Sequence, residues 1–216
     1  MKKALYFILI LVTQITFSQS FEGRVTYKTT MENPYPDMFT DSVFKEKILK
    51  PVFGDQGFML QTYYYKGDQY MSEIATGLEN GFEVYVPNKK KLYAWKANST
   101  EAVVHKTDVH SDLDAFVELI ETKEIDTILN IPCKKILLKS KMGTGELWLN
   151  TDYLKVNAGD YADFKLNHKN IIFQKYGCLP FRTRMGTMTV EVIAIESMEV
   201  AIEKFELPKF ESEIEP

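Results

Sequence analysis

The sequence predicts an α+β fold, in which a curved, mostly antiparallel sheet of about eight or nine strands carries two or three helices on one face. Two observations lead to this prediction. Most of the chain consists of short segments in which apolar and polar residues alternate, and nearly all of them are joined by turns too short for a parallel crossover. A few longer connections instead place apolar residues at helical spacing. No internal repeat or linker divides residues 21–208, which we therefore expect to form a single domain.

Residues 1–20 have the three parts of a cleavable secretory signal peptide. Lys2 and Lys3 provide the positive start, Ala4 to Val12 form an apolar run, and small residues suit cleavage after Ser20. The run is shorter than the roughly 20 residues that span a bilayer, and a signal anchor is the alternative interpretation. No Cys follows the cleavage site to carry a lipid anchor. We expect a periplasmic protein without a membrane span in its mature chain, with secretion as the alternative.

The mature chain is acidic. Loss of the two lysines of the signal peptide changes the net charge from −4 to −6. A negative surface without a Lys/Arg stripe repels phosphate backbones, so we expect no nucleic-acid partner. Acidic residues are concentrated at the C-terminus, and residues 209–216 are predicted to form a flexible acidic tail.

The first two elements of the mature chain are a strand and a helix. Apolar and polar residues alternate from Phe21 to Thr29, as in a strand with one buried face. Asp41 is expected to cap a helix whose apolar residues recur every four to five positions. Pro51 should kink or end this helix, and Gly54 should stop it.

Two hairpins and a second helix are predicted next. Phe58 to Met71 folds back at Gly67-Asp68, and Phe82 to Val86 pairs with Lys91 to Trp95. In Asp112 to Glu121 the apolar residues fall at i, i+3, i+4 and i+7, which favours a short helix, with a strand as the alternative.

The last part of the chain is again rich in strands. Residues 157–165 are expected to form one or two helical turns. A long final strand is predicted from Phe181 to about Val200, interrupted near Gly186. Three further strands, the last two joined by a turn at 142–145, are predicted over Ile125 to Ile131, Cys133 to Ser140 and Glu146 to Asn150.

Several short motifs along the mature chain resemble the LolA/LolB-like periplasmic lipoprotein-carrier superfamily, and more closely an uncharacterised group of exported bacterial proteins with that architecture. Their order is more informative than any one of them. They are Phe21-Glu22-Gly23, Tyr64-Tyr65-Lys66-Gly67-Asp68, Lys91-Leu92-Tyr93, Ile131-Pro132-Cys133-Lys134-Lys135, Gly177-Cys178-Leu179-Pro180 and Phe205-Glu206-Leu207-Pro208.

The resemblance implies a half-barrel with helices covering its concave face, and an apolar ligand such as a lipid between sheet and helices. Under this hypothesis the protein is an exported, non-catalytic binding protein. Aromatic and Met side chains on predicted strands suit an adaptable apolar lining, although ordinary core packing is the alternative for each. The candidate lining residues are Tyr63, Tyr65, Met71, Tyr93, Trp95 and Trp148.

No residue pattern indicates catalysis or a cofactor. The sequence has no GxSxG motif and no P-loop. His105 and His110 lie near three aspartates, but their spacing of five residues matches neither one helix face nor one strand face, so we interpret this segment as a polar loop and predict no metal site.

The two cysteines leave two interpretations open. In an oxidising compartment Cys133 and Cys178 can form a disulfide. Alternatively, both are buried free thiols, because Cys is among the most buried residue types. Neither lies in a CxxC motif or beside a His, which argues against redox catalysis or a Cys nucleophile.

A second hypothesis is that the protein is an interaction module of the cell envelope. A sheet edge or the acidic tail would then bind a protein partner. This hypothesis predicts a filled core and an exposed apolar patch, whereas a carrier needs an internal apolar pocket.

Overall fold

The computed structural model describes residues 20–110 and 112–216, so all of the predicted signal peptide except Ser20 lies outside the described residues. Within these ranges, no helix is both long enough and apolar enough to cross a membrane.

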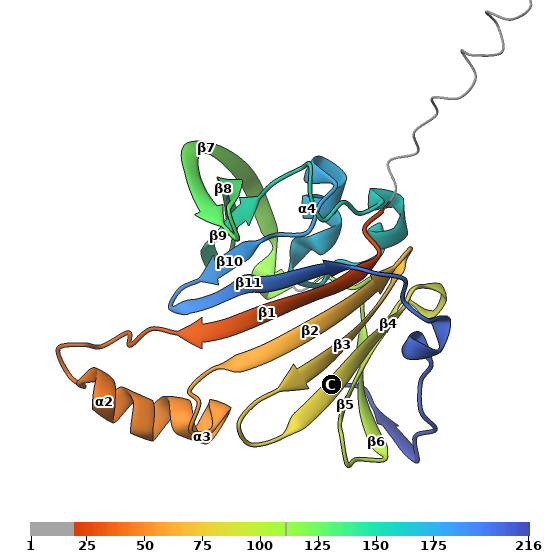
Figure 1. Cartoon of the computed structure of the whole chain (residues 1–216), viewed down its shortest axis with the longest axis horizontal. Helices are drawn as coiled ribbons and strands as arrows, with labels where there is room; N and C mark the ends of the chain where they lie inside the picture. Colours follow the sequence, from red (N-terminus) through yellow and green to blue (C-terminus); the bar gives the residue numbers. More distant parts are fainter. Residues whose placement is uncertain (1–19, 111) are drawn as a thin grey trace, which may run out of the picture.

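One sheet contains all twelve strands that the structure describes (Figure 1). Their order is β12-β6-β5-β4-β3-β2-β1-β11-β10-β9-β8-β7, and the sheet does not close, so that β12 and β7 are its edges. All neighbours are antiparallel except β12 and β6. The strands are β1 Gly23–Met31, β2 Met59–Lys66, β3 Gln69–Ala75, β4 Asn80–Val86, β5 Lys91–Lys96, β6 Glu101–Lys106, β7 Phe116–Ile128, β8 Ile131–Ser140, β9 Gly143–Leu149, β10 Arg182–Met185, β11 Met188–Ser197 and β12 Ser212–Ile214.

The longer helical elements form two segments. The first runs without a break through α2 (Asp41–Phe44), a π-helical stretch (Lys45–Leu49) and α3 (Lys50–Phe53). It begins after Thr40, whose hydroxyl accepts a hydrogen bond from the Val43 amide, and ends at Gly54 with φ +74°. The second is α4 (Lys169–Tyr176), which lies above β1 and β11 in Figure 1, whereas α2 and α3 lie below β1. The predicted helix that ends at Gly54 is confirmed, but its cap is Thr40 and not Asp41, which is the first helical residue.

The predicted architecture, a half-barrel of eight or nine strands with two or three helices over its concave face, is wrong. The sheet has twelve strands. The prediction had fewer because it missed β6 and the very short β12, and because it counted β10 and β11 as one long strand. The segment 41–53 lies beyond the end of β1, away from α4 (Figure 1). Among the helical elements of the described residues, only α4 and short 3₁₀ turns pack against the face of the sheet that holds the main core.

In Asp112 to Glu121 the favoured helix is wrong, and the alternative, a strand, is found from Phe116 onward. A 3₁₀ turn at Asp112–Asp114 is followed by β7, which pairs with β8. The pairing register shifts between Phe116 and Glu118 and again between Glu121 and Ile125. The first of these bulges lies within the segment and disturbs the strict alternation of the strand there, which explains why the apolar spacing imitates a helix.

The two predicted hairpins are confirmed, and they fix which residues share a face. Lys66 pairs with Gln69 across the turn, so Tyr65 faces Tyr70 and Tyr64 faces Met71. We call the face that carries Tyr65 and Tyr70 the inner face, and the opposite one the outer face. Successive residues of a strand point to opposite faces.

Each face of the sheet has its own core. On the inner face, residues from both halves of the sheet pack with α4 and with the 3₁₀ turn Ala158–Tyr161. On the outer face, the segment after β11 covers β3 to β5 with Val200, Phe205, Leu207 and Phe210. The acidic segment 209–216, predicted to be a flexible tail, forms β12 along β6.

Candidate functional site

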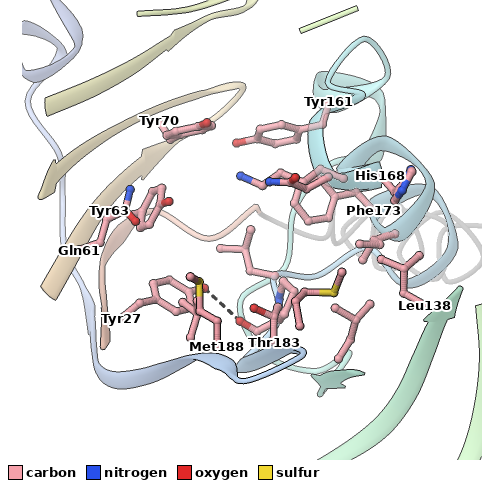
Figure 2. Close-up of a pocket in the computed structure, with 18 of the residues that line it drawn as sticks. Tyr27, Gln61, Tyr63, Tyr70, Leu138, Tyr161, His168, Phe173, Thr183 and Met188 are labelled. Atoms are coloured by element: carbon pink, nitrogen blue, oxygen red, sulfur yellow. Dashed lines mark hydrogen bonds between the residues drawn. The ribbon is translucent and has the colours of Figure 1, made fainter. Parts of the chain in front are cut away.

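A cavity of about 350 Å³ lies on the inner face between the sheet and α4. Its walls come from β1 to β3, from β8 to β11, and from the segment that leads into α4. Figure 2 shows the side chains around it. Its volume is near the lower end of the range for small-molecule sites, about 300–1,000 Å³.

Five tyrosines form one part of the wall. Positions 61, 63 and 65 of β2 alternate onto the inner face, which places Gln61 beside two of these tyrosines. The Tyr63 and Tyr65 rings are stacked with centroids 5.7 Å apart, and the Tyr27 ring meets Tyr63 edge-on at 5.6 Å. Such contacts hold the rings in fixed orientations. The five are Tyr27, Tyr63, Tyr65, Tyr70 and Tyr161.

Burial controls the protonation of these phenols. It raises the pKa of Tyr63, Tyr65 and Tyr70 well above the usual value of 10.0, because a phenolate would lose its hydration. The pKa of Tyr27 and that of Tyr161 are raised for the same reason. The hydroxyl groups are therefore neutral at physiological pH and can donate hydrogen bonds.

Aliphatic and sulfur-containing side chains form the opposite part of the wall. Met185 and Met188, at the β10–β11 turn, are 47% and 39% exposed while lining the cavity. Met side chains adapt their shape easily, so this turn forms a deformable, solvent-facing edge. Other apolar wall residues are Leu138, Leu147, Ile172, Phe173 and Val190.

Lys169, the first residue of α4, brings a positive charge to the cavity. Its ammonium lies 5.2 Å from the centroid of the Tyr70 ring and 4.8 Å from that of Phe164. Burial lowers the pKa of Lys169, and the charge of Glu83 opposes this effect. The preceding residues, Asn167 and His168, have φ values of 53° and 58°. These left-handed conformations are unusual outside glycine, and they turn the chain into α4.

A second polar group lies on the inner face beside the tyrosines. The amide of Gln61 donates hydrogen bonds to Ser72 Oγ and Glu83 Oε2, both at 3.0 Å. Ser72 donates to the same Glu83 oxygen at 3.2 Å. Gln61 on β2 and Ser72 on β3 thus fix the position of the Glu83 carboxylate on β4.

At the other side of the cavity, His168 Nε2 lies 3.2 Å from Asp114 Oδ2. The His168 ring packs against Phe116 with centroids 5.9 Å apart. The metal-ligand residue types of 105–114 do not converge: in the described part of the chain, no three His, Cys, Asp or Glu side chains are grouped to hold a metal ion.

The six candidate lining residues lie in three places. Tyr63 and Tyr65 line the cavity. Met71, Tyr93 and Trp95 lie on the outer face, where the C-terminal segment covers them. Trp148 lies on β9 next to Leu147, a wall residue, and its ring contacts the guanidinium of Arg182 and the ammonium of Lys135 on neighbouring strands.

The sequence interpretation missed Gln61, Tyr70, Tyr161 and Lys169. Tyr70 had a usable signal, because the hairpin turn at Gly67-Asp68 places it opposite Tyr65 and puts Met71 on the other face. Lys169 had none. Its helix is short and begins after a left-handed His168 without a side-chain cap, so the usual start signals are missing.

The two cysteines are free thiols in this structure, and both are buried in the inner core. Burial raises the pKa of the Cys133 thiol to about 11 and that of Cys178 to about 12. Protonated thiols are weak nucleophiles and weak metal ligands, which agrees with a packing role.

Comparison with known proteins supports only a fold-level likeness. No model of a known protein family matches the chain, and no curated protein matches its sequence. An uncharacterized conserved protein from Thermus thermophilus superimposes with a TM-score of 0.51 at 13% identity, over 99% of each chain. At this identity the likeness concerns the fold alone. The resemblance to the lipoprotein carriers stays a prediction.

Two crystal forms of PNGF-II superimpose with a TM-score of 0.49, at 13% and 14% identity. They match 91% of this chain but only 32% and 31% of PNGF-II, so the chain spans about a third of the length of that protein.

Proposed function

We propose that the protein is exported and acts as a non-catalytic binding protein that holds a lipid or another apolar small molecule in the inner-face cavity. The observation that carries the proposal is the cavity between sheet and α4, with its mainly aromatic and aliphatic walls. Its size favours a single-chain lipid or a compact apolar molecule. The signal-like residues 1–20 support export.

The lining also fits a binding role. The stacked tyrosines provide rigid apolar surface, while Met185 and Met188 provide a deformable edge through which a ligand can enter. The interaction-module hypothesis requires a filled core, and the cavity therefore favours the binding protein.

The first experiment is native mass spectrometry of the mature protein purified from the periplasm, followed by organic extraction. We expect an added mass of lipid size that the extraction releases. A bare polypeptide mass, together with no gain in thermal stability when decanol or decanoate is added, would contradict the proposal and favour the interaction module.

A variant that fills the cavity tests where the ligand binds. Val190 lines the cavity from β11, so Val190→Trp should weaken the binding of decanol at least tenfold, measured by calorimetry. Overpacking costs about 1–3 kcal/mol, and circular dichroism checks that the variant is folded. Ile193→Trp is the matched control, because Ile193 lies on the same strand, is 41% exposed and does not line the cavity. Equal loss of binding in both variants would argue against this site.

A further inference from the structure

We propose that the cavity selects an apolar ligand that carries one carboxylate, and that Lys169 pairs with this carboxylate. The inference rests on the proposed function and adds the chemical class of the ligand. It starts from the part of the cavity wall at which the hydroxyl groups of Tyr70 and Tyr161 lie, which we call the tyrosine end. Figure 2 shows these two hydroxyl groups pointing toward each other, with Leu138 and Met188 farther away.

The ammonium of Lys169 belongs to the tyrosine end, because it lies 5.2 Å from the ring centroid of Tyr70. Among the residues that the structure describes, no carboxylate lies within 4.0 Å of it, whereas Lys66 and Lys204, also partly buried, each have such a partner. A positive charge removed from water without a counter-ion is unfavourable. A ligand carboxylate at this end would supply that counter-ion.

Glu83 does not form a direct ion pair with Lys169, because its carboxylate lies more than 4.0 Å from the ammonium. It is the carboxylate whose charge acts on Lys169, but its Oε2 atom accepts hydrogen bonds from Gln61 and Ser72. Glu83 also disfavours a ligand with more than one negative charge. The single ammonium of Lys169 therefore matches a monocarboxylate better than a doubly charged phosphate.

Tyr161 provides a second, independent indication. It is 1% exposed and lines the cavity, yet its hydroxyl has no hydrogen-bond partner among the described residues. A buried hydroxyl without a partner is unfavourable, and charge-assisted hydrogen bonds to a carboxylate are among the strongest. One ammonium and one free phenol at the same end can bind the two oxygens of one carboxylate, with the apolar chain against the aliphatic and sulfur-containing side chains of the wall.

The test compares decanoate with decanol, which differ only in the head group. For the unmodified protein we expect decanoate to bind at least tenfold more tightly than decanol in calorimetry. Lys169→Met should remove this preference, so that the ratio of the two affinities falls to near one, while Lys169→Arg should keep it. Lys175→Met is the matched control, because Lys175 lies on the same helix but outside the cavity wall, and it should change neither affinity.

Two outcomes would overturn the inference while leaving the proposed function intact. One is equal affinity of the unmodified protein for the two compounds. The other is a preference for decanoate that survives in Lys169→Met. If neither compound binds to the unmodified, delipidated protein, the proposed function fails and the inference fails with it. Thermal unfolding of each variant, followed by circular dichroism, shows whether it is folded.

Discussion

At the scale of single residues, Glu22 joins the start of β1 to the segment that covers the outer face. Its carboxylate accepts hydrogen bonds from the Val200 amide and from the Lys66 ammonium, both at 2.9 Å. Lys66 also donates to the Val200 carbonyl at 2.7 Å. Three segments far apart in sequence thus meet at one carboxylate.

This network makes stability depend on pH. The Val200 amide and then Lys66 lower the pKa of Glu22 below its usual value of 4.5. Because the unfolded chain takes up the proton first as pH falls, the contribution of Glu22 is present above 4.5 and is lost as pH falls through the folded-state pKa. We expect Glu22→Gln to lower the urea midpoint at neutral pH, with a difference from the unmodified protein that vanishes in acid.

The control for this measurement is Glu213→Gln, because Glu213 is exposed on β12 and has no ion pair with the described residues. It should leave the midpoint nearly unchanged at every pH. A difference between Glu22→Gln and the unmodified protein that is the same at neutral and acid pH would show that the carboxylate charge is not the cause.

At the scale of elements, the C-terminal segment acts as a second layer over the outer face. Phe205, on the 3₁₀ turn Ile202–Phe205, is 7% exposed and packs with Met71 and Val84. Phe210 stacks on Tyr93 with ring centroids 6.3 Å apart. The segment therefore buries apolar residues on the outer face of β3 to β5, including Met71, Tyr93 and Trp95.

We expect Phe205→Ala to lower the free energy of unfolding by about 3–5 kcal/mol, as for other buried Phe residues. Urea unfolding measures this loss. Because Phe205 lies on the opposite face of the sheet, decanol binding by the folded variant should not change. Ile202→Ala, on the same turn but 56% exposed, should stay within about 0.5 kcal/mol of the unmodified protein. An equal loss in both variants would mean that the segment does not act through burial.

At the scale of the whole molecule, the open sheet has two edges that other chains could pair with. β12 covers the edge of β6, where Ser212 pairs with Glu101 and Ile214 with Val103. Glu215 adds ion pairs to Lys91 and Lys106. An uncovered edge strand is a template for self-association, so the acidic terminus protects this side of the sheet.

Deletion of residues 211–216 should therefore promote self-association, because it exposes the hydrogen-bonding groups of β6. Sedimentation velocity over a range of concentrations should show faster-sedimenting species than the full chain gives. Glu215→Gln, which keeps β12 and removes only the two ion pairs, should behave like the full chain. If the deletion variant sediments like the full chain at every concentration, β12 has no protective role.

Local sequence signals were sufficient to predict three elements: the hairpin β2–β3, the hairpin β4–β5 and the helix that ends at Gly54. Their signals lie within a few residues, in tight turns, period-two alternation and helix-terminating glycine. The same local rules placed Tyr63 and Tyr65 on one face, and these are the two candidate lining residues that reach the cavity.

The other features could not be predicted from local signals, because each of them depends on partners distant in sequence. β7 is a strand since β8 supplies its hydrogen bonds despite two register shifts. β12 forms because β6 offers a free edge, and α4 is placed by packing against the inner core. The cavity lies between α4 and strands from both halves of the sheet, β1 to β3 and β8 to β11, which are distant in sequence. Local periodicity predicts which face of a strand is apolar, but it does not predict which other segment of the chain packs on that face.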